Sequence, residues 1–256
     1  MNWRTLLTTT LQLYQQVARD TWKNVQHNWW IALLPLVYGL IFLITGVIAA
    51  QLGMLGGFLL GFVLALCTSS YLYFIAGVVA GNRMTFAELR ESWRPCLNPV
   101  MTVLFFFFVV QLALSMILPG MAGAGLISLL INLTLLIVLN PIPEIVYQGR
   151  SEGFDMLQES VDFLRENGIE WFAPLVVISL LSFVAPLPFM AVVSQSGNLS
   201  APTVGGNELL FGSATGILMA ILSAVLLYVL MVFRGLLFRA LASGTRRQRL
   251  YRAGLS

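Results

Sequence analysis

The stretch Pro99-Val-Met-Thr-Val-Leu-Phe-Phe-Phe-Phe-Val-Val-Gln-Leu-Ala-Leu-Ser-Met-Ile-Leu-Pro119 contains no charged residue and is long enough to cross the hydrocarbon of a bilayer as one helix. Five further apolar runs of similar length lie elsewhere in the chain: Trp29–Leu52, Leu55–Ala80, Leu126–Tyr147, Ile169–Val193 and Leu209–Phe238. The sequence therefore predicts an all-α protein, a polytopic membrane helix bundle with six transmembrane helices in three hairpins.

The composition agrees with this class of protein. Hydrophobic residues make up 58% of the chain and charged residues 10%, whereas about a quarter of the residues of an ordinary soluble domain are charged. The net charge of +3 does not indicate nucleic-acid binding, because the basic residues lie in segments that can share one side of the membrane.

That distribution orients the chain. All 14 Lys and Arg residues fall in segments that can lie on one side of the membrane. The three connecting segments assigned to the other side contain none: Gln51–Gly57, Gly120–Gly125 and Ser194–Glu208. Because cytoplasmic loops retain Lys and Arg, both termini are predicted to be cytoplasmic, and no cleaved signal peptide is expected.

The predicted cytoplasmic segments are patterned as well. Apolar residues recur in them at three- and four-residue steps among charged residues, which is typical of amphipathic helices that lie in the membrane interface. We therefore expect one membrane domain, 1–256, in which such a helix or segment precedes each hairpin. Its parts are an interfacial helix (1–28), hairpin one (29–80), an interfacial segment (81–98), hairpin two (99–147), an interfacial helix (150–167), hairpin three (169–238) and a basic tail (239–256).

An internal repeat supports this division into three units. Asn28-Trp-Trp-Ile-Ala-Leu-Leu-Pro35-Leu36 and Asn167-Gly-Ile-Glu-Trp-Phe-Ala-Pro174-Leu175 share an Asn followed, after six residues, by Pro-Leu. The middle unit has Asn98 at the corresponding junction but Phe105 in place of the proline. The repeat is thus clear for units one and three.

This layout resembles a known family when two further stretches are added, Asn140-Pro-Ile-Pro-Glu144 and Gly153-Phe-Asp-Met-Leu-Gln-Glu-Ser160. The chain is similar to a group of six-helix bacterial inner-membrane proteins related to the membrane domain of glycerophosphoryl diester phosphodiesterases. The resemblance implies a multi-pass protein of the bacterial cytoplasmic membrane. The chemistry of the family's enzymes belongs to a separate soluble domain, so no catalytic residue carries over, and we expect neither an enzyme nor a cofactor.

The first candidate site lies at the inner end of the fourth apolar run. Pro141 and Pro143 lack backbone donors, which predicts a broken helix beside the acid Glu144. With Asn140 such a break can form an ion or substrate site. The favoured interpretation is a helix end, with Glu144 either in interfacial water or paired with Arg234 on the last span.

Two amides inside the spans, Gln111 and Asn132, form a second candidate group. Together with scattered hydroxyl groups they could line a polar path. Such side chains more often bond to a neighbouring helix or to their own backbone, and we favour that interpretation.

Small residues at four-residue intervals, Gly53, Gly57 and Gly61, form a ridge on the second span that allows a close helix approach. Packing within the bundle is the default interpretation. The face of a homo-oligomer is the alternative, and the sequence leaves both open.

Membrane lipids are the expected partners of the chain. Anionic headgroups are one possible partner of the tail residues, which are Arg246, Arg247, Arg249 and Arg252. The acidic stretch Glu152–Glu166 is an equally favoured partner for the tail. Two functions stay in view: a non-enzymatic bundle that organises lipid or a partner protein at the inner leaflet, and a transporter or exporter of a lipid or hydrophobic metabolite.

Overall fold

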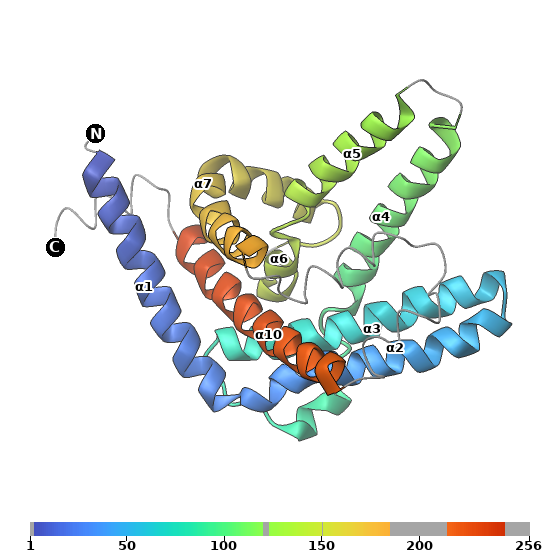
Figure 1. Ribbon diagram of the computed structural model, residues 1–256, viewed down its shortest axis with the longest axis horizontal. Helices are drawn as coiled ribbons and strands as arrows, with labels where there is room; N and C mark the ends of the chain where they lie inside the picture. The colour runs from blue at the N-terminus through green and yellow to red at the C-terminus, as the bar shows by residue number, and fades with distance from the viewer. Residues whose placement is uncertain (1–2, 120–122, 150, 185–213, 244–256) are drawn as a thin grey trace.

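The computed structural model describes residues 3–119, 123–149, 151–184 and 214–243. Within these ranges the regular structure is entirely helical (Figure 1). The helices are α1 (Trp3–His27), η1 (Trp29–Leu33), α2 (Leu34–Gln51), α3 (Met54–Val79), η2 (Phe86–Arg90), α4 (Leu97–Ile117), α5 (Ala124–Val138), α6 (Ile142–Gln148), α7 (Asp155–Val184) and α10 (Ala214–Ala242).

Five helical stretches are long and apolar enough to cross a membrane: Trp29–Gln51, Met54–Val79, Leu97–Ile117, Ala124–Gln148 and Ala220–Ala242. They coincide with five of the six predicted spans, so this is a membrane protein by the length and composition of its helices. The remaining predicted span, Ile169–Val193, is described only as far as Val184 and is not among the five. The connection Ser194–Glu208 and the tail beyond residue 243 lie outside the described residues.

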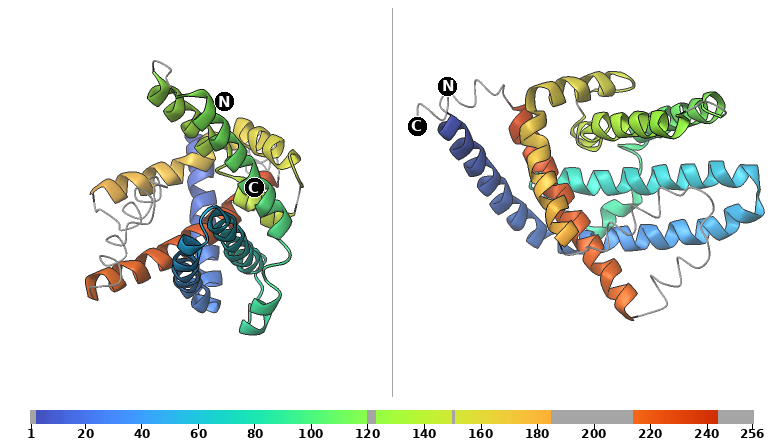
Figure 2. Two further views of the ribbon diagram at one scale, coloured as in Figure 1. Left: turned by 90° about the vertical axis from the view of Figure 1, so that its right-hand side faces the viewer. Right: turned by 45° about the horizontal axis from the view of Figure 1, so that its top comes forward.

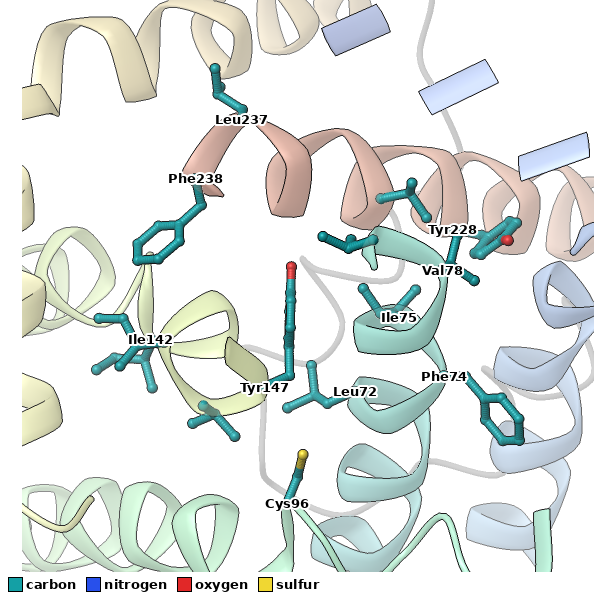
Figure 3. Packing of buried hydrophobic residues seen from close by; sticks show 14 of the residues in the cluster. Leu72, Phe74, Ile75, Val78, Cys96, Ile142, Tyr147, Tyr228, Leu237 and Phe238 are labelled. Atoms are coloured by element: carbon teal, nitrogen blue, oxygen red, sulfur yellow. The ribbon is translucent and has the colours of Figure 1, made fainter. Parts of the chain in front are cut away.

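The hydrophobic core lies where the helix ends meet rather than along a parallel bundle. α10 packs against α1, η1, α2, α3, α6 and α7. It runs obliquely across the first hairpin instead of alongside it (Figures 1 and 2). Figure 3 shows the side chains that fill the junction, among them Val78 from α3, Ile142 and Tyr147 from α6, and Phe238 from α10. We call this region the junction.

Two hairpins, α2–α3 and α4–α5, project from the junction (Figures 1 and 2). In the most apolar part of α4, only 6% of the residues are buried inside the chain, and in that of the α5–α6 stretch only 11% are. The described part of the chain therefore leaves most of the second hairpin uncovered.

Residues 81–96 of the predicted interfacial segment 81–98 contain the short 3-10 helix η2 and turns but no α-helix, and residues 97–98 already belong to α4. Gly81 begins the segment with φ of 83°, a conformation that glycine adopts without strain. Glu88 caps the start of η2, where its carboxylate accepts from the backbone N–H of Thr85. Pro95 disfavours helical backbone at Arg94. A segment this short between two breaks does not sustain an α-helix on its own.

The predicted interfacial helix 150–167 and the start of the next span form one helix, α7. α7 changes direction along its length (Figures 1 and 2). It contains Gly168 and Pro174, two residue types that weaken or interrupt the backbone hydrogen-bond ladder and so allow a helix to bend without ending.

Candidate functional site

The helix break predicted near Glu144 is present, and it frees backbone carbonyl groups. α5 ends at Val138 and α6 begins at Ile142, with Pro141 at its N-cap. Continuing a helix across this point would need N–H groups that Pro141 and Pro143 lack. Side chains from other helices bond the freed carbonyls instead. Ser160 of α7 donates to the carbonyl of Val138.

Arg234 of α10 joins this break to Glu144. Its Nη2 donates to the carbonyl oxygen of Asn140 at 2.5 Å. Its Nε and Nη2 donate to the two carboxylate oxygens of Glu144 at 2.8 and 3.0 Å. Glu144 is fully buried, and the Arg234 side chain is 14% exposed. A paired, bidentate geometry is the arrangement in which two such charges are tolerated away from water.

Trp171 of α7 completes the group. Its indole Nε1 donates to Oδ1 of Asn140 at 2.8 Å, and the guanidinium carbon of Arg234 lies 5.0 Å from its ring centroid, which is cation–π distance. We call Asn140, Glu144, Trp171 and Arg234 the junction cluster. It links α6, α7, α10 and the break after α5, and both carboxylate oxygens of Glu144 are bonded within it.

Comparable contacts close the end of α3. The carbonyl of Val78 accepts a hydrogen bond from Asn24 of α1 at 3.0 Å, and that of Val79 accepts one from Arg239 of α10 at 3.2 Å. Arginine at a helix C-terminus also opposes the negative end of the helix dipole. α10 therefore supplies Arg239 to the end of the first hairpin and Arg234 to the end of the second.

Tyr14 links α1 to α7 one residue before Trp171. Its hydroxyl donates to the backbone carbonyl of Glu170 at 2.7 Å. Burial, and then the negative charge of Glu170, raise the pKa of Tyr14 to about 12. The phenol therefore stays protonated and able to donate throughout the physiological pH range.

The amides Gln111 and Asn132 lie apart from the junction cluster, inside the α4–α5 hairpin. Nε2 of Gln111 donates to Oδ1 of Asn132 at 2.7 Å, and Nδ2 of Asn132 donates to the carbonyl of Ser128 at 2.8 Å. The favoured interpretation, that these amides hold neighbouring helices together, agrees with these contacts.

The predicted glycine ridge does not make the closest helix contact within the chain. Gly53 sits in the turn before α3 with φ of 55°, and a Cβ built at Gly57 or Gly61 would meet nothing within 4 Å. The close approach of α2 to α3 uses Gly56, where a Cβ would lie 2.0 Å from the carbonyl oxygen of Ala49. Gly57 and Gly61 face outward from the chain.

Sequence reasoning missed Trp171 and Ser160. Both lie in stretches already noted for the repeat and the family resemblance, but neither residue type marks a site. The available signal was the indole N–H of Trp171, which needs a partner when it is buried in an apolar helix.

No protein-family model, no curated protein and no solved structure matches this chain. The geometry of the junction cluster is that of a structural contact, which joins the second hairpin to α7 and α10.

Proposed function

We propose that this chain is a non-enzymatic membrane protein that organises lipid or a partner protein at the inner leaflet of a bacterial cytoplasmic membrane. One contrast carries the proposal. The charges of Glu144 and Arg234 neutralise each other inside the junction, whereas the other described helices leave most of the α4–α5 hairpin uncovered. These buried charges thus serve the fold, and the exposed surface of the second hairpin is apolar.

The uncovered surface of the α4–α5 hairpin consists of bulky apolar side chains. The exposed apolar residues of α4 and α5 include Phe105, Phe108, Met116, Ile117, Leu126, Leu129 and Leu136. A surface of this kind is stable only against lipid or against another protein. Its extent along both helices supports a role in contacting either, rather than an enclosed chemical site.

The positions of the basic residues support an orientation of the chain in the membrane. Arg83, Arg90 and Arg94, between α3 and α4, and Arg239, at the end of α10, all lie near the junction end of the hairpins. The positive-inside rule then assigns the junction to the cytoplasmic side and the α2–α3 and α4–α5 turns to the opposite side.

Extraction of the full chain in a mild detergent, followed by native mass spectrometry, tests this proposal. We expect phospholipid or a defined protein to remain bound at levels above those on an unrelated membrane protein extracted in parallel. Neither bound protein nor enriched lipid would contradict it.

A specific observation favours a second candidate, a transporter of a lipid or hydrophobic metabolite. Broken helices beside an acid form substrate sites in many transporters, and the chain has such a break between Val138 and Ile142, next to Glu144. Flux into vesicles by Glu144→Gln and Asn140→Ala variants separates the two. Unchanged flux in both variants would remove this site from the transport hypothesis.

A further inference from the structure

The outward side of α1 carries an apolar stripe. Leu11, Ala18 and Trp22 are spaced by seven and four residues, so they lie on one line along the helix, with Gln15 at its edge toward the polar side. Trp29 lies beyond the end of α1, in η1, and is a second exposed tryptophan at this end of the helix. Trp22 is 61% exposed and Trp29 is 66% exposed, although large aromatic side chains are usually well covered in a folded chain.

Basic residues flank this stripe. Arg19 and Lys23 are one turn apart and both exposed, on the side of the stripe away from the core-facing residues Val17 and Thr21. α1 thus presents three sides in order around its axis: one packed on the rest of the chain, one apolar and open, and one polar, on which Arg19 and Lys23 lie among glutamines and Asp20.

A second segment, residues 82–93 between α3 and α4, lies beside the end of α1. The side chain of Asn28 donates to the carbonyl of Asn82 at 3.1 Å and accepts from the backbone N–H of Met84 at 2.9 Å. The ring centroids of Trp30 and Phe86 are 4.1 Å apart. These contacts hold Arg83 and Phe86 next to the α1–η1 turn, and Phe86 is 68% exposed.

Buried hydroxyl groups fix the far end of the same segment. Ser92 and Ser70 are hydrogen-bonded at 2.5 Å, and Ser69 donates to the carbonyl of Trp93 at 2.6 Å. The segment is therefore attached to the α1–η1 turn at one end and to α3 at the other, and Arg83 and Phe86 lie at the end next to the α1–η1 turn.

We propose that α1 and this segment form a docking surface for the anionic phospholipids of the inner leaflet. Trp22, Trp29 and Phe86 would sit at headgroup depth, where aromatic side chains are enriched. Arg19, Lys23 and Arg83 would bind the phosphate groups. Within the described parts of the chain, none of these three cations has an ion-pair partner, so their charge is available to an anionic surface.

This inference rests on the lipid form of the proposed function and names its ligand class and residues. The test uses the full chain solubilised with equal amounts of phosphatidylglycerol and phosphatidylcholine, with the ratio of the two retained lipids measured by native mass spectrometry. A variant carrying Arg19→Gln, Lys23→Gln and Arg83→Gln is compared with one carrying Arg246→Gln, Arg247→Gln and Arg249→Gln, which removes the same charge from the tail.

Each basic residue near a membrane surface changes lipid affinity by about fivefold. We expect the first variant to lose at least about tenfold of the preference for phosphatidylglycerol, and the tail variant to keep it. Circular dichroism and size-exclusion profiles should match those of the unmodified chain, because the three side chains are exposed.

A preference that survives in the first variant overturns this surface and leaves the proposed function standing. An equal loss in both variants also overturns it, because the effect would then follow total charge. If the unmodified chain shows no preference, both this surface and the lipid form of the proposed function are contradicted.

Discussion

Replacing Arg234 with leucine is expected to lower the free energy of unfolding by about 3–5 kcal/mol, the usual cost of leaving one partner of a buried ion pair alone. Glu144 is completely buried and both its carboxylate oxygens accept from Arg234. The variant also removes the donor to the Asn140 carbonyl. Denaturant titration in mixed micelles, followed by circular dichroism, measures the loss.

Two further variants test the explanation. Arg239→Leu removes a cation from the same helix that makes one hydrogen bond, so it should cost only about 1 kcal/mol. The double variant Glu144→Leu with Arg234→Leu should be more stable than the sum of the single losses implies, since no charge remains buried. Strictly additive losses would show that the two side chains do not interact.

Gly56→Ala is expected to destabilise the chain by about 1–3 kcal/mol, the range for overpacking a close contact. The added Cβ would lie 2.0 Å from a backbone oxygen and 2.7 Å from a backbone carbon of Ala49. Backbone cannot rotate aside as the end of a side chain can, so α2 and α3 would have to separate. Thermal unfolding in detergent provides the measurement.

Gly57→Ala is the matched control, because it adds the same methyl group one residue along the same helix. A Cβ there meets nothing within 4 Å, and alanine favours helix over glycine by up to about 1 kcal/mol. We expect an unchanged or slightly higher unfolding temperature. Equal destabilisation by both substitutions would contradict the assignment of the contact to Gly56.

The sequence predicted the spanning helices well because an apolar run and its length are local properties. Pro99–Pro119, for example, corresponds closely to α4. The helix break was equally predictable, because Pro141 and Pro143 lack a backbone N–H donor in any context. Pairing of Glu144 with Arg234 was foreseen as one part of the favoured interpretation, since a buried acid in such a chain needs a cation.

Other features depend on which faces meet, and sequence pattern does not give this. Four glycines lie near the start of α3, and their order alone does not show that Gly56 faces α2 while Gly57 and Gly61 face away. α7 continues through Pro174 and packs against α5, α6 and α10, which the sequence pattern does not show. Trp171 belongs to the cluster because α7 packs against the break, and this contact cannot be predicted from the residue's place in the sequence.

The repeat between units one and three stays a prediction, supported by burial. Positions related by the alignment of Asn28 with Asn167 are buried in both units. The pairs are Val17 and Met156, Thr21 and Ser160, Ile31 and Glu170, and Ala32 and Trp171. In each unit the Asn side chain also donates to the carbonyl four residues earlier. The backbone differs between the units, because α1 ends before Asn28 whereas α7 continues through Asn167.

The central claim is that the hairpins cross the membrane with the junction on the cytoplasmic side. Labelling of single-cysteine variants in intact cells with a membrane-impermeant maleimide tests it most directly, in a background of Cys67→Ser and Cys96→Ser. We predict that cysteines replacing Met54 and Pro119, at the two hairpin turns, react from outside. Those replacing Arg83 and Glu152 should react only after the cells are opened; labelling of either one in intact cells, or protection of Met54 and Pro119, would contradict the claim.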